Sequence, residues 1–359
     1  MVEDTRCQTI LIAVADSNLE NATKSIAIIK AMQEHNLIPI IASEGASLQF
    51  LKKEFPYITT IELPNYAINV NAYLQALNWK LMRKIPAIAL AILEEKKALK
   101  KWTMEHAIDG IISIDRLGLY SSKIPSVYIT QQLCPFPENA NSILNKLFGF
   151  QVKKFSECWL QHNILDSGKK EADLVFKKFG IEFRHINIAS RMHYKEVSIK
   201  NKLLVLLSGN EPQRTLLEQK IQNELVNFKG KVVFVKGLFE KEQQRVVLKK
   251  VTYYNYLTTK QLETVINESD LVLCRPEESI VADLIELSKK AFFIPETNNI
   301  QQLKTACILK DSKQAAFSLL EDFKIEQLNY IHEYKGLTTT DITVNWQELF
   351  SLFRVKQNT

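Results

Sequence analysis

The residues best suited to bind a ligand lie in short polar loops that directly follow apolar runs of strand length. One of these loops reads SGNEPQRT, from Ser208 to Thr215, and a helical pattern begins near its end. Ser208 and Gly209 allow a tight turn, the free N–H groups of a helix start attract anions, and Arg214 can donate to a phosphate. The same residues also suit an ordinary polar turn between a strand and a helix.

Two further loops carry groups that fit a sugar or a nucleotide. CRPEESIVAD, from Cys274 to Asp283, leaves an apolar run and opens a helix that we expect Ser279 to cap. A carboxylate at Asp283 suits the two hydroxyls of a ribose, although it also fits as a polar residue of the first turn. PETNNIQQ, from Pro295 to Gln302, is rich in amides that can hydrogen-bond sugar hydroxyls.

The first polar loop, ADSNLENATK from Ala15 to Lys24, contains no glycine. A dinucleotide cannot closely approach such a backbone, which argues against a nicotinamide-dependent dehydrogenase. The signatures of phosphate-loop nucleotidases, HExxH zinc enzymes and α/β-hydrolases are absent from the sequence. The six histidines and five cysteines show no metal-ligand spacing, so we expect no metal ion and no cofactor.

The segments between these loops predict the scaffold that positions them. Apolar runs such as TILIAVA (Thr9 to Ala15) alternate with amphipathic helical stretches, and the pattern restarts with LLVLLSG after a polar stretch ending at Lys202. Such alternation predicts parallel sheets covered on both faces, with ligands at the carboxyl ends of the strands. We therefore predict an α/β protein of two Rossmann-like, doubly wound domains. They span residues 1–192 and 193–359, with a last helix at about 344–355 that can pack back on the first domain.

Length and composition agree with this organisation. A chain of 359 residues suits two domains. The net charge of +6 is not gathered into a basic stripe, so we expect no nucleic-acid partner. No apolar run reaches the roughly 18 residues of a membrane span, and acidic residues precede the first apolar run. These features and the scattered cysteines favour a cytoplasmic protein.

One basic segment stands apart from the ligand loops. Residues 73–102 are helical by pattern, are interrupted by Pro86, and mix leucine, isoleucine and tryptophan with seven lysines and arginines. A long surface helix packed on the sheet explains this composition. The alternative is a peripheral contact with an anionic membrane on its inner face, which would suit a lipid-linked acceptor.

Taken in order, the loops resemble a bacterial glycosyltransferase family related to family 28, which includes the peptidoglycan N-acetylglucosaminyltransferase. SGNEPQRT is close to the family pattern S-G-P-E-P-Q-R-T. DRLGLYS (Asp115 to Ser121) and ITQQL (Ile129 to Leu133) are similar to its D-x-R-x-G-L-Y-S and I-T-H-Q-L stretches. The resemblance implies the GT-B fold, with two Rossmann-like domains facing a cleft. It also implies a nucleotide sugar on the C-terminal domain and an acceptor on the N-terminal one.

Two loops depart from the family pattern. Where the family has G-x-G-H-A-T-R, this chain has NLENATK, so Asn21 replaces the histidine that would act as general base and Lys24 replaces the arginine. The donor loop R-S-G-Y-S-T is here RPEESI, which places Glu277 and Glu278 where a diphosphate would carry negative charge. Residues at four other family positions are retained: Arg275, Ser279, Asp283 and Gln302.

The resemblance therefore implies an inverting hexosyltransferase that uses a nucleotide sugar, expected to be a uridine diphosphate sugar, and a lipid-linked or glycan acceptor. The retained residues would hold the donor, and three others would lie near its diphosphate: Ser208, Gly209 and Arg214. Asp115, or alternatively Asp16 or Glu20, would deprotonate the acceptor. The competing hypothesis is a catalytically inactive descendant that acts as a nucleotide-binding or scaffold module, because the histidine and the glycines of the first loop are both replaced.

Overall fold

The computed structural model describes residues 7–16, 19–64, 85–131, 143–162, 180–338 and 344–354. The chain forms two compact units. Unit 1 consists of Met1–Asn187 together with Thr343–Thr359, and unit 2 consists of Ile188–Ile342. The division thus lies slightly before the expected boundary at residue 192, and the last helix belongs to unit 1.

Unit 1 is built on a seven-stranded sheet in the order β3-β2-β1-β4-β5-β6-β7, in which every neighbouring pair is parallel. The central strands β1, β4 and β5 are buried over nearly their whole length, as continuous apolar runs predict. The strands are β1 (Thr9–Val14), β2 (Ile38–Ser43), β3 (Thr60–Glu62), β4 (Gly110–Ile114), β5 (Ser126–Thr130), β6 (Glu157–His162) and β7 (Phe183–Asn187).

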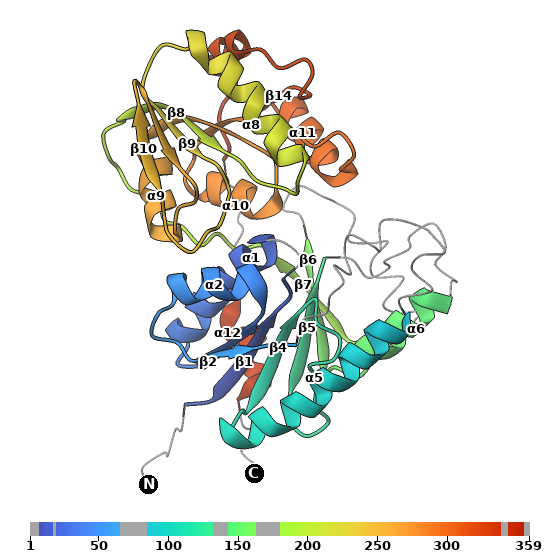
Figure 1. Cartoon of the computed structure of the whole chain (residues 1–359). Coiled ribbons are helices and arrows are strands. Elements are labelled where there is room, and N and C mark those ends of the chain that lie inside the picture. Colours follow the sequence, from blue (N-terminus) through green and yellow to red (C-terminus); the bar gives the residue numbers. More distant parts are fainter. Residues whose placement is uncertain are drawn as a thin grey trace. The chain divides into compact units, whose positions relative to one another are not determined.

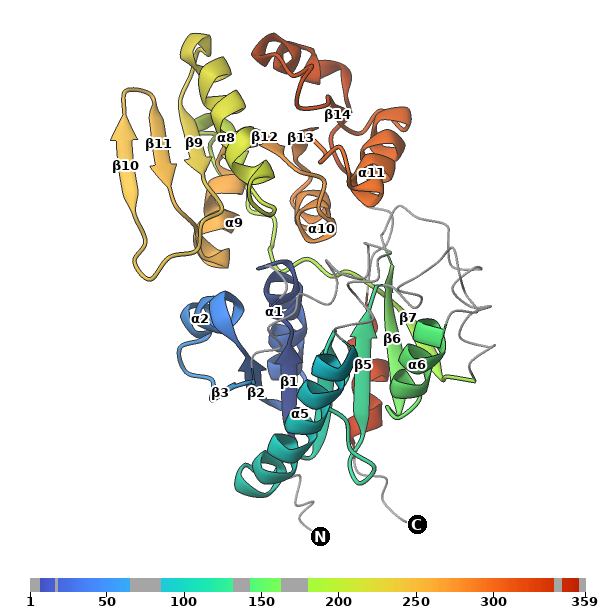
Figure 2. The same cartoon turned by 45° about the vertical axis from the view of Figure 1, so that its right-hand side comes forward.

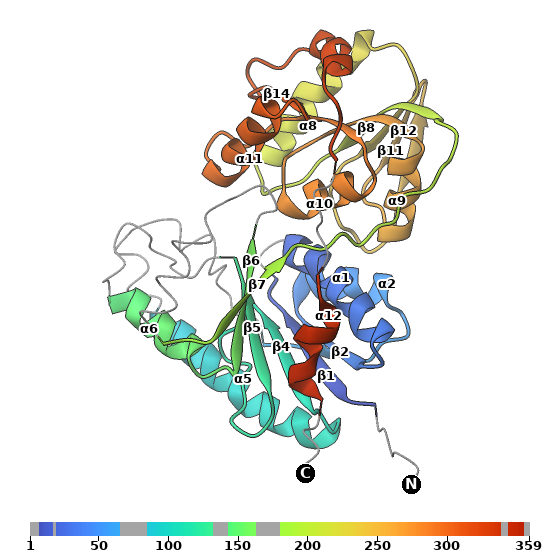
Figure 3. The same cartoon turned by 180° about the vertical axis from the view of Figure 1, so that it is seen from behind.

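Helices cover both faces of this sheet (Figures 1 and 3). On one face lie α5 (Ile85–Glu105) and α6 (Ile143–Val152). On the other lie α1 (Leu19–Glu34), α2 (Gly45–Glu54) and α12 (Trp346–Phe350), which continues into the 3₁₀ helix η4 (Ser351–Phe353). Pro86 is the second residue of α5, where a missing N–H costs no helical hydrogen bond. The first part of the basic segment, residues 73–84, lies outside the described residues.

The last helix completes the aromatic core of unit 1. The Phe350 ring meets His35 edge-on at a centroid distance of 5.6 Å and lies 6.3 Å from the Trp159 ring. Phe353 packs against Gly110 so closely that a Cβ on that glycine would lie 2.4 Å from the Phe353 ring. Arg184 on β7 pairs with Glu348 at 2.9 Å. The end of the chain is therefore an integral layer of unit 1.

Unit 2 contains a second seven-stranded sheet, in the order β10-β11-β9-β8-β12-β13-β14 (Figure 2). Its pairs are parallel except for the antiparallel hairpin β10–β11. The strands are β8 (Asn201–Leu206), β9 (Val232–Val235), β10 (Arg245–Leu248), β11 (Val251–Tyr254), β12 (Ser269–Cys274), β13 (Lys290–Phe293) and β14 (Ala316–Phe317). The helices are α8 (Gln213–Glu224), η2 (Leu225–Asn227), α9 (Thr259–Asn267), α10 (Glu278–Glu286), α11 (Ile300–Asp311) and η3 (Ile325–Glu333).

The predicted pair of doubly wound α/β domains is confirmed, whereas the β10–β11 hairpin was not predicted. In unit 1 the chain runs from β1 outward to β2 and β3 and then returns to β4 on the other side of β1. In unit 2 it runs from β8 to β9 on one side and later to β12 on the other. Each sheet therefore has a topological switch point, where ligands of open α/β sheets bind. None of the helices in the described ranges is long and apolar enough to cross a membrane.

Replacing Phe350 by alanine should destabilise unit 1, because the ring is buried against His35 and Trp159. We expect Phe350→Ala to lower the free energy of unfolding by about 3–5 kcal/mol, as measured by urea denaturation. The control is Gln347→Ala on the exposed side of the same helix, which should change it by less than about 0.5 kcal/mol. Equal stabilities of the two variants would show that α12 is not part of the core.

Candidate functional site

Three predicted donor residues of unit 2 lie at the carboxyl ends of two adjacent strands. Ser208 and Gly209 follow β8, and Arg275 follows β12. Because β8 and β12 flank the switch point, Gly209 and Arg275 face each other across it. This is the position at which the sequence analysis expects a nucleotide.

Arg275 is in tight contact with Gly209. Its side chain is 3% exposed, and a Cβ on Gly209 would lie only 1.8 Å from Arg275 Nη1. The φ angle of Gly209 is +101°, a region that residues with a side chain rarely adopt. Glycine is therefore required here twice, by the backbone conformation and by the guanidinium that occupies the space of a side chain.

Glu296 joins this pair and was not predicted. Its Oε2 atom accepts a hydrogen bond from Arg275 Nη1 at 2.9 Å. The backbone N–H of Glu296 donates to Gln302 Oε1 at 2.9 Å, so the predicted donor residue Gln302 fixes the position of Glu296. Arg275 Nε is buried and has no hydrogen-bond partner within the described part of the chain. The structure thus brings together Gly209, Arg275 and Gln302, and the Glu296 carboxylate is bonded to Arg275.

Asp283 is anchored to the segment that enters unit 2. The carboxylate, 1% exposed, accepts from Ser190 Oγ at 2.8 Å, from the Arg191 backbone N–H at 3.1 Å and from Arg191 Nε at 3.1 Å. These bonds tie α10 to residues 190 and 191. The expected cap at Ser279 is wrong, because α10 begins at Glu278 and places Ser279, which is buried, inside the first turn.

Arg214 lies at the start of α8, and its guanidinium hydrogen-bonds to neighbouring protein groups. It donates to Glu211 at 2.5 Å, to Glu218 at 2.7 Å and to the Lys236 carbonyl at 3.1 Å. Burial alone would lower its pKa, but the hydrogen bonds to Glu218 and Glu211 raise the pKa above its ordinary value. Arg214 therefore links the loop after β8 to the end of β9.

In unit 1, Asn21 and Asp115 meet at the other switch point. Asp115 directly follows β4, and Asn21 lies in the first turns of α1, after β1. Asn21 Nδ2 donates to Asp115 Oδ2 at 3.4 Å. Asp115 has a φ of +55°, an uncommon backbone conformation for a residue other than glycine and one that is often found at functional sites. Burial raises the pKa of the neighbouring Cys158 thiol, and the charge of Asp115 raises it further.

The turn that carries Asp115 is held by a buried ion cluster. Arg116, 1% exposed, lies 2.5 Å from Glu44 and 2.7 Å from Glu95, and its Nη2 donates to the Pro64 carbonyl at 3.0 Å. Glu95 also accepts from the Gly118 backbone N–H at 3.1 Å. One guanidinium between two carboxylates therefore connects α5, the loop after β2 and the turn after β4. This network fixes the conformation of the turn that contains Asp115.

The other candidate residues of the first loop have structural partners. Asp16 accepts from the backbone N–H groups of Ala46 and Ser47, both at 3.1 Å, and so caps α2 from a distance in sequence. Glu20 and Lys24 form an ion pair of 2.6 Å along α1, in which the lysine is buried. Among the three acidic candidates of unit 1, Asp115 is the one that accepts a hydrogen bond from Asn21.

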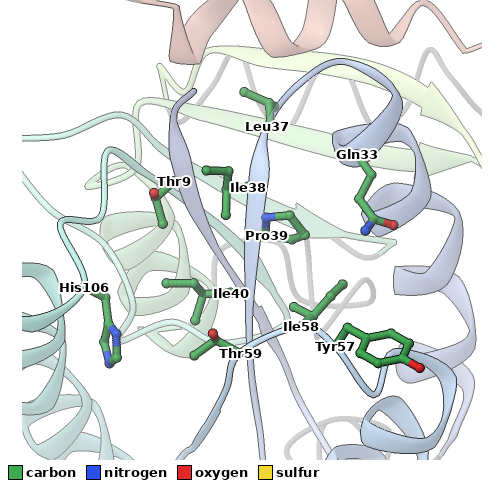
Figure 4. A pocket seen from close by; sticks show the side chains of 10 residues that line it. All are labelled: Thr9, Gln33, Leu37, Ile38, Pro39, Ile40, Tyr57, Ile58, Thr59 and His106. Atoms are coloured by element: carbon green, nitrogen blue, oxygen red, sulfur yellow. The ribbon is translucent and has the colours of Figure 1, made fainter. Parts of the chain in front are cut away.

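The hollow in Figure 4 lies elsewhere in unit 1. It has a volume of about 500 Å³ and is lined by ten residues, among them Thr9, Ile38, Tyr57 and His106. Thr9 and Ile38 begin β1 and β2, so this hollow is at the amino ends of the strands, opposite the edge that carries Asp115. None of the predicted site residues lines it. Within the described ranges, no group of three or more His, Cys, Asp or Glu side chains could hold a metal ion.

Comparison with solved structures identifies the fold. SnogD, a glycosyltransferase from Streptomyces nogalater, superimposes with a TM-score of 0.59 at 9% identity, over 97% of this chain and all of that one. The spinosyn rhamnosyltransferase SpnG gives 0.60 at 10% identity over 96% and 95%. VinC, solved in complex with DTDP, gives 0.55 at 10% identity over 96% and 99%. The chain has the GT-B fold. No protein-family model and no curated protein sequence matches it.

In this GT-B chain the carboxylate of Asp283 holds two parts of unit 2 together. Asp283→Ala would remove the carboxylate that accepts from the buried Arg191 guanidinium and from two further donors. We expect the free energy of unfolding to fall by about 3–5 kcal/mol in urea denaturation. Glu286→Ala, which removes an exposed carboxylate from the same helix, is the control, with an expected change below about 0.5 kcal/mol. A change of that small size in Asp283→Ala would remove its anchoring role.

Proposed function

We propose that this protein transfers a sugar from a nucleoside diphosphate donor to the hydroxyl of an acceptor. The observation that carries the proposal is the buried Arg275 guanidinium beside Gly209 at the switch point of unit 2. A planar cation whose Nε–H has no partner among the described residues suits the oxygens of a diphosphate. The GT-B fold of solved glycosyltransferases supports the same class of reaction, since one of them is described in complex with DTDP.

On the donor side we assign the diphosphate to Ser208, Gly209 and Arg275. Gln302 takes part by fixing the loop after β13, and Ser279 by its place in the first turn of α10. Arg214 acts indirectly in this proposal, because its guanidinium already shapes the loop after β8. Asp283 can accept ribose hydroxyls only when a donor such as Ser190 Oγ is released. The nucleotide is a uridine or thymidine diphosphate.

On the acceptor side we assign the general base to Asp115. An inverting transfer needs a group that takes the proton of the acceptor hydroxyl, and the neutral amide of Asn21 cannot take it at neutral pH. Asn21 instead orients the Asp115 carboxylate through its hydrogen bond. Asp16 and Glu20 are weaker candidates, because one caps α2 and the other pairs with Lys24. The reaction as proposed uses no metal ion or other cofactor.

Two measurements test this function. Uridine or thymidine diphosphate, or a sugar derivative of either, should raise the melting temperature at millimolar concentration. If none does, the donor assignment fails. With a donor that binds, Asp115→Asn should lower kcat for nucleoside diphosphate release by roughly 10²–10⁴-fold while leaving the affinity for the nucleotide unchanged. The matched control is Glu62→Gln, an exposed carboxylate at the end of β3, which should keep full activity. Unchanged turnover in Asp115→Asn would exclude that residue as the base.

The acceptor that fits best is a lipid-linked sugar or glycan at the inner membrane face. On the described part of α5, Leu90 and Leu93 are each 61% exposed. They lie ahead of Lys97, Lys100 and Lys101, which are also exposed, and a helix surface of this kind binds anionic lipid. This surface supports a cytoplasmic protein that contacts the membrane peripherally.

The membrane contact predicts binding to vesicles of phosphatidylglycerol and weak binding to phosphatidylcholine. Because each buried leucine contributes about 1.5–3 kcal/mol, replacing both Leu90 and Leu93 by serine should weaken binding at least tenfold in a co-sedimentation assay. Leu216→Ser, an exposed leucine of unit 2, serves as the control and should bind like the wild type. Equal binding of both vesicle types would contradict an electrostatic contact.

The alternative function is a nucleotide-binding or scaffold module without catalysis. Two contacts favour it. Glu296 occupies the Arg275 guanidinium that would bind the diphosphate, and the amide of Asn21, which cannot take a proton, lies beside Asp115. Nucleotide binding without donor hydrolysis or transfer, with a range of acceptors, would establish this alternative.

A further inference from the structure

We propose that Glu296 is a built-in counter-anion of the donor site, and that a diphosphate binds by displacing its carboxylate from Arg275. This inference rests on the proposed function of Arg275 as a phosphate-binding residue. It makes Glu296 an affinity-determining residue, because every nucleotide must compete with the negative charge that already pairs with Arg275.

The geometry supports a contact that can be exchanged. Arg275 is fixed, because its guanidinium is 3% exposed and lies against Gly209, with no room to move toward the β8 loop. Glu296 differs, since its side chain is 25% exposed while its backbone N–H is held by Gln302. The backbone of the loop is therefore anchored at the point where the side chain can rotate toward solvent. Such a rotation would present both Nη1 and the unpartnered Nε of Arg275 to phosphate oxygens.

The surrounding charges make the contact selective. Glu277 and Glu278 lie at the start of α10, two and three residues after Arg275, and Glu278 Oε1 accepts from Gln301 Nε2 at 3.2 Å. An anion near Arg275 therefore meets an acidic rim while Glu296 remains in place. A ligand with one negative charge gains little by displacing Glu296, because Arg275 then exchanges one singly charged partner for another. A diphosphate carries more charge and more acceptor oxygens, so it is the class of ligand that can outcompete Glu296.

The test is a calorimetric titration of uridine diphosphate, thymidine diphosphate and inorganic pyrophosphate into the full-length protein and its variants. Glu296→Gln keeps the size of the side chain and an acceptor oxygen but removes the charge, so it should bind at least about tenfold more tightly than the wild type. Glu296→Asp keeps the charge and should stay within about threefold of the wild type. Glu286→Gln removes an exposed carboxylate at the other end of α10 and should also stay within about threefold.

A double variant shows whether the gain passes through Arg275. In Glu296→Gln combined with Arg275→Gln, the tighter binding should disappear, giving a large coupling energy between the two positions. If Glu296→Gln lacks a cooperative melting transition, Glu296→Ala replaces it as the neutral variant. The inference is overturned if the neutral variant binds no ligand, if it binds no more tightly than the wild type, or if the gain persists without Arg275.

The pyrophosphate arm separates this inference from the proposed function. Tighter pyrophosphate binding by Glu296→Gln, with no binding of either nucleotide to any variant, would support the displacement and overturn only the nucleotide assignment. Tight nucleotide binding by the wild type that Glu296→Gln leaves unchanged would support the proposed function and overturn the displacement.

Discussion

Both candidate sites depend on one topological constraint. In each sheet the chain leaves a central strand in one direction and later returns on the other side of it, so the two loops at that point diverge and leave the strand ends uncovered. Unit 1 places Asp115 and Asn21 there, and unit 2 places Arg275 and Gly209 there. The topology thus brings these side chains together at the carboxyl edge of each sheet.

Sequence reasoning located the scaffold because the buried strands of parallel sheets are continuous apolar runs. It failed for the β10–β11 hairpin, whose strands span four residues each, and all four residues of β10 are exposed, so burial leaves no signal in the sequence. It reached Gly209 through the tight turn expected after an apolar strand, and Arg275 and Gln302 through the resemblance of their loops. It missed Glu296, which meets Arg275 across 21 residues of chain. The one available signal was that Glu296 directly follows an apolar run of strand length, which places an acidic side chain at the carboxyl end of a strand.

Several residues that could hold a ligand are also needed to hold the protein together. Asp283 anchors the entry of the chain into unit 2, Arg214 ties the loop after β8 to β9, and Asp16 caps α2. Buried charged groups are stable only with such partners, because removing an ion from water without compensation is costly. Residue type and position along the chain are the same for a ligand-binding carboxylate and an anchoring one. The distinction lies in hydrogen bonds that depend on tertiary structure.

The order of the segments along the chain determines which unit can finish folding first. Unit 2 is one continuous stretch, whereas unit 1 needs α12, which follows unit 2 in the sequence. Domains generally fold as units while the chain leaves the ribosome. The nascent protein would therefore carry a finished second domain on an unfinished first one. Until α12 is released, Trp159 and Gly110 lack the Phe350 and Phe353 rings that pack against them, so unit 1 closes after unit 2 although most of it is synthesised earlier.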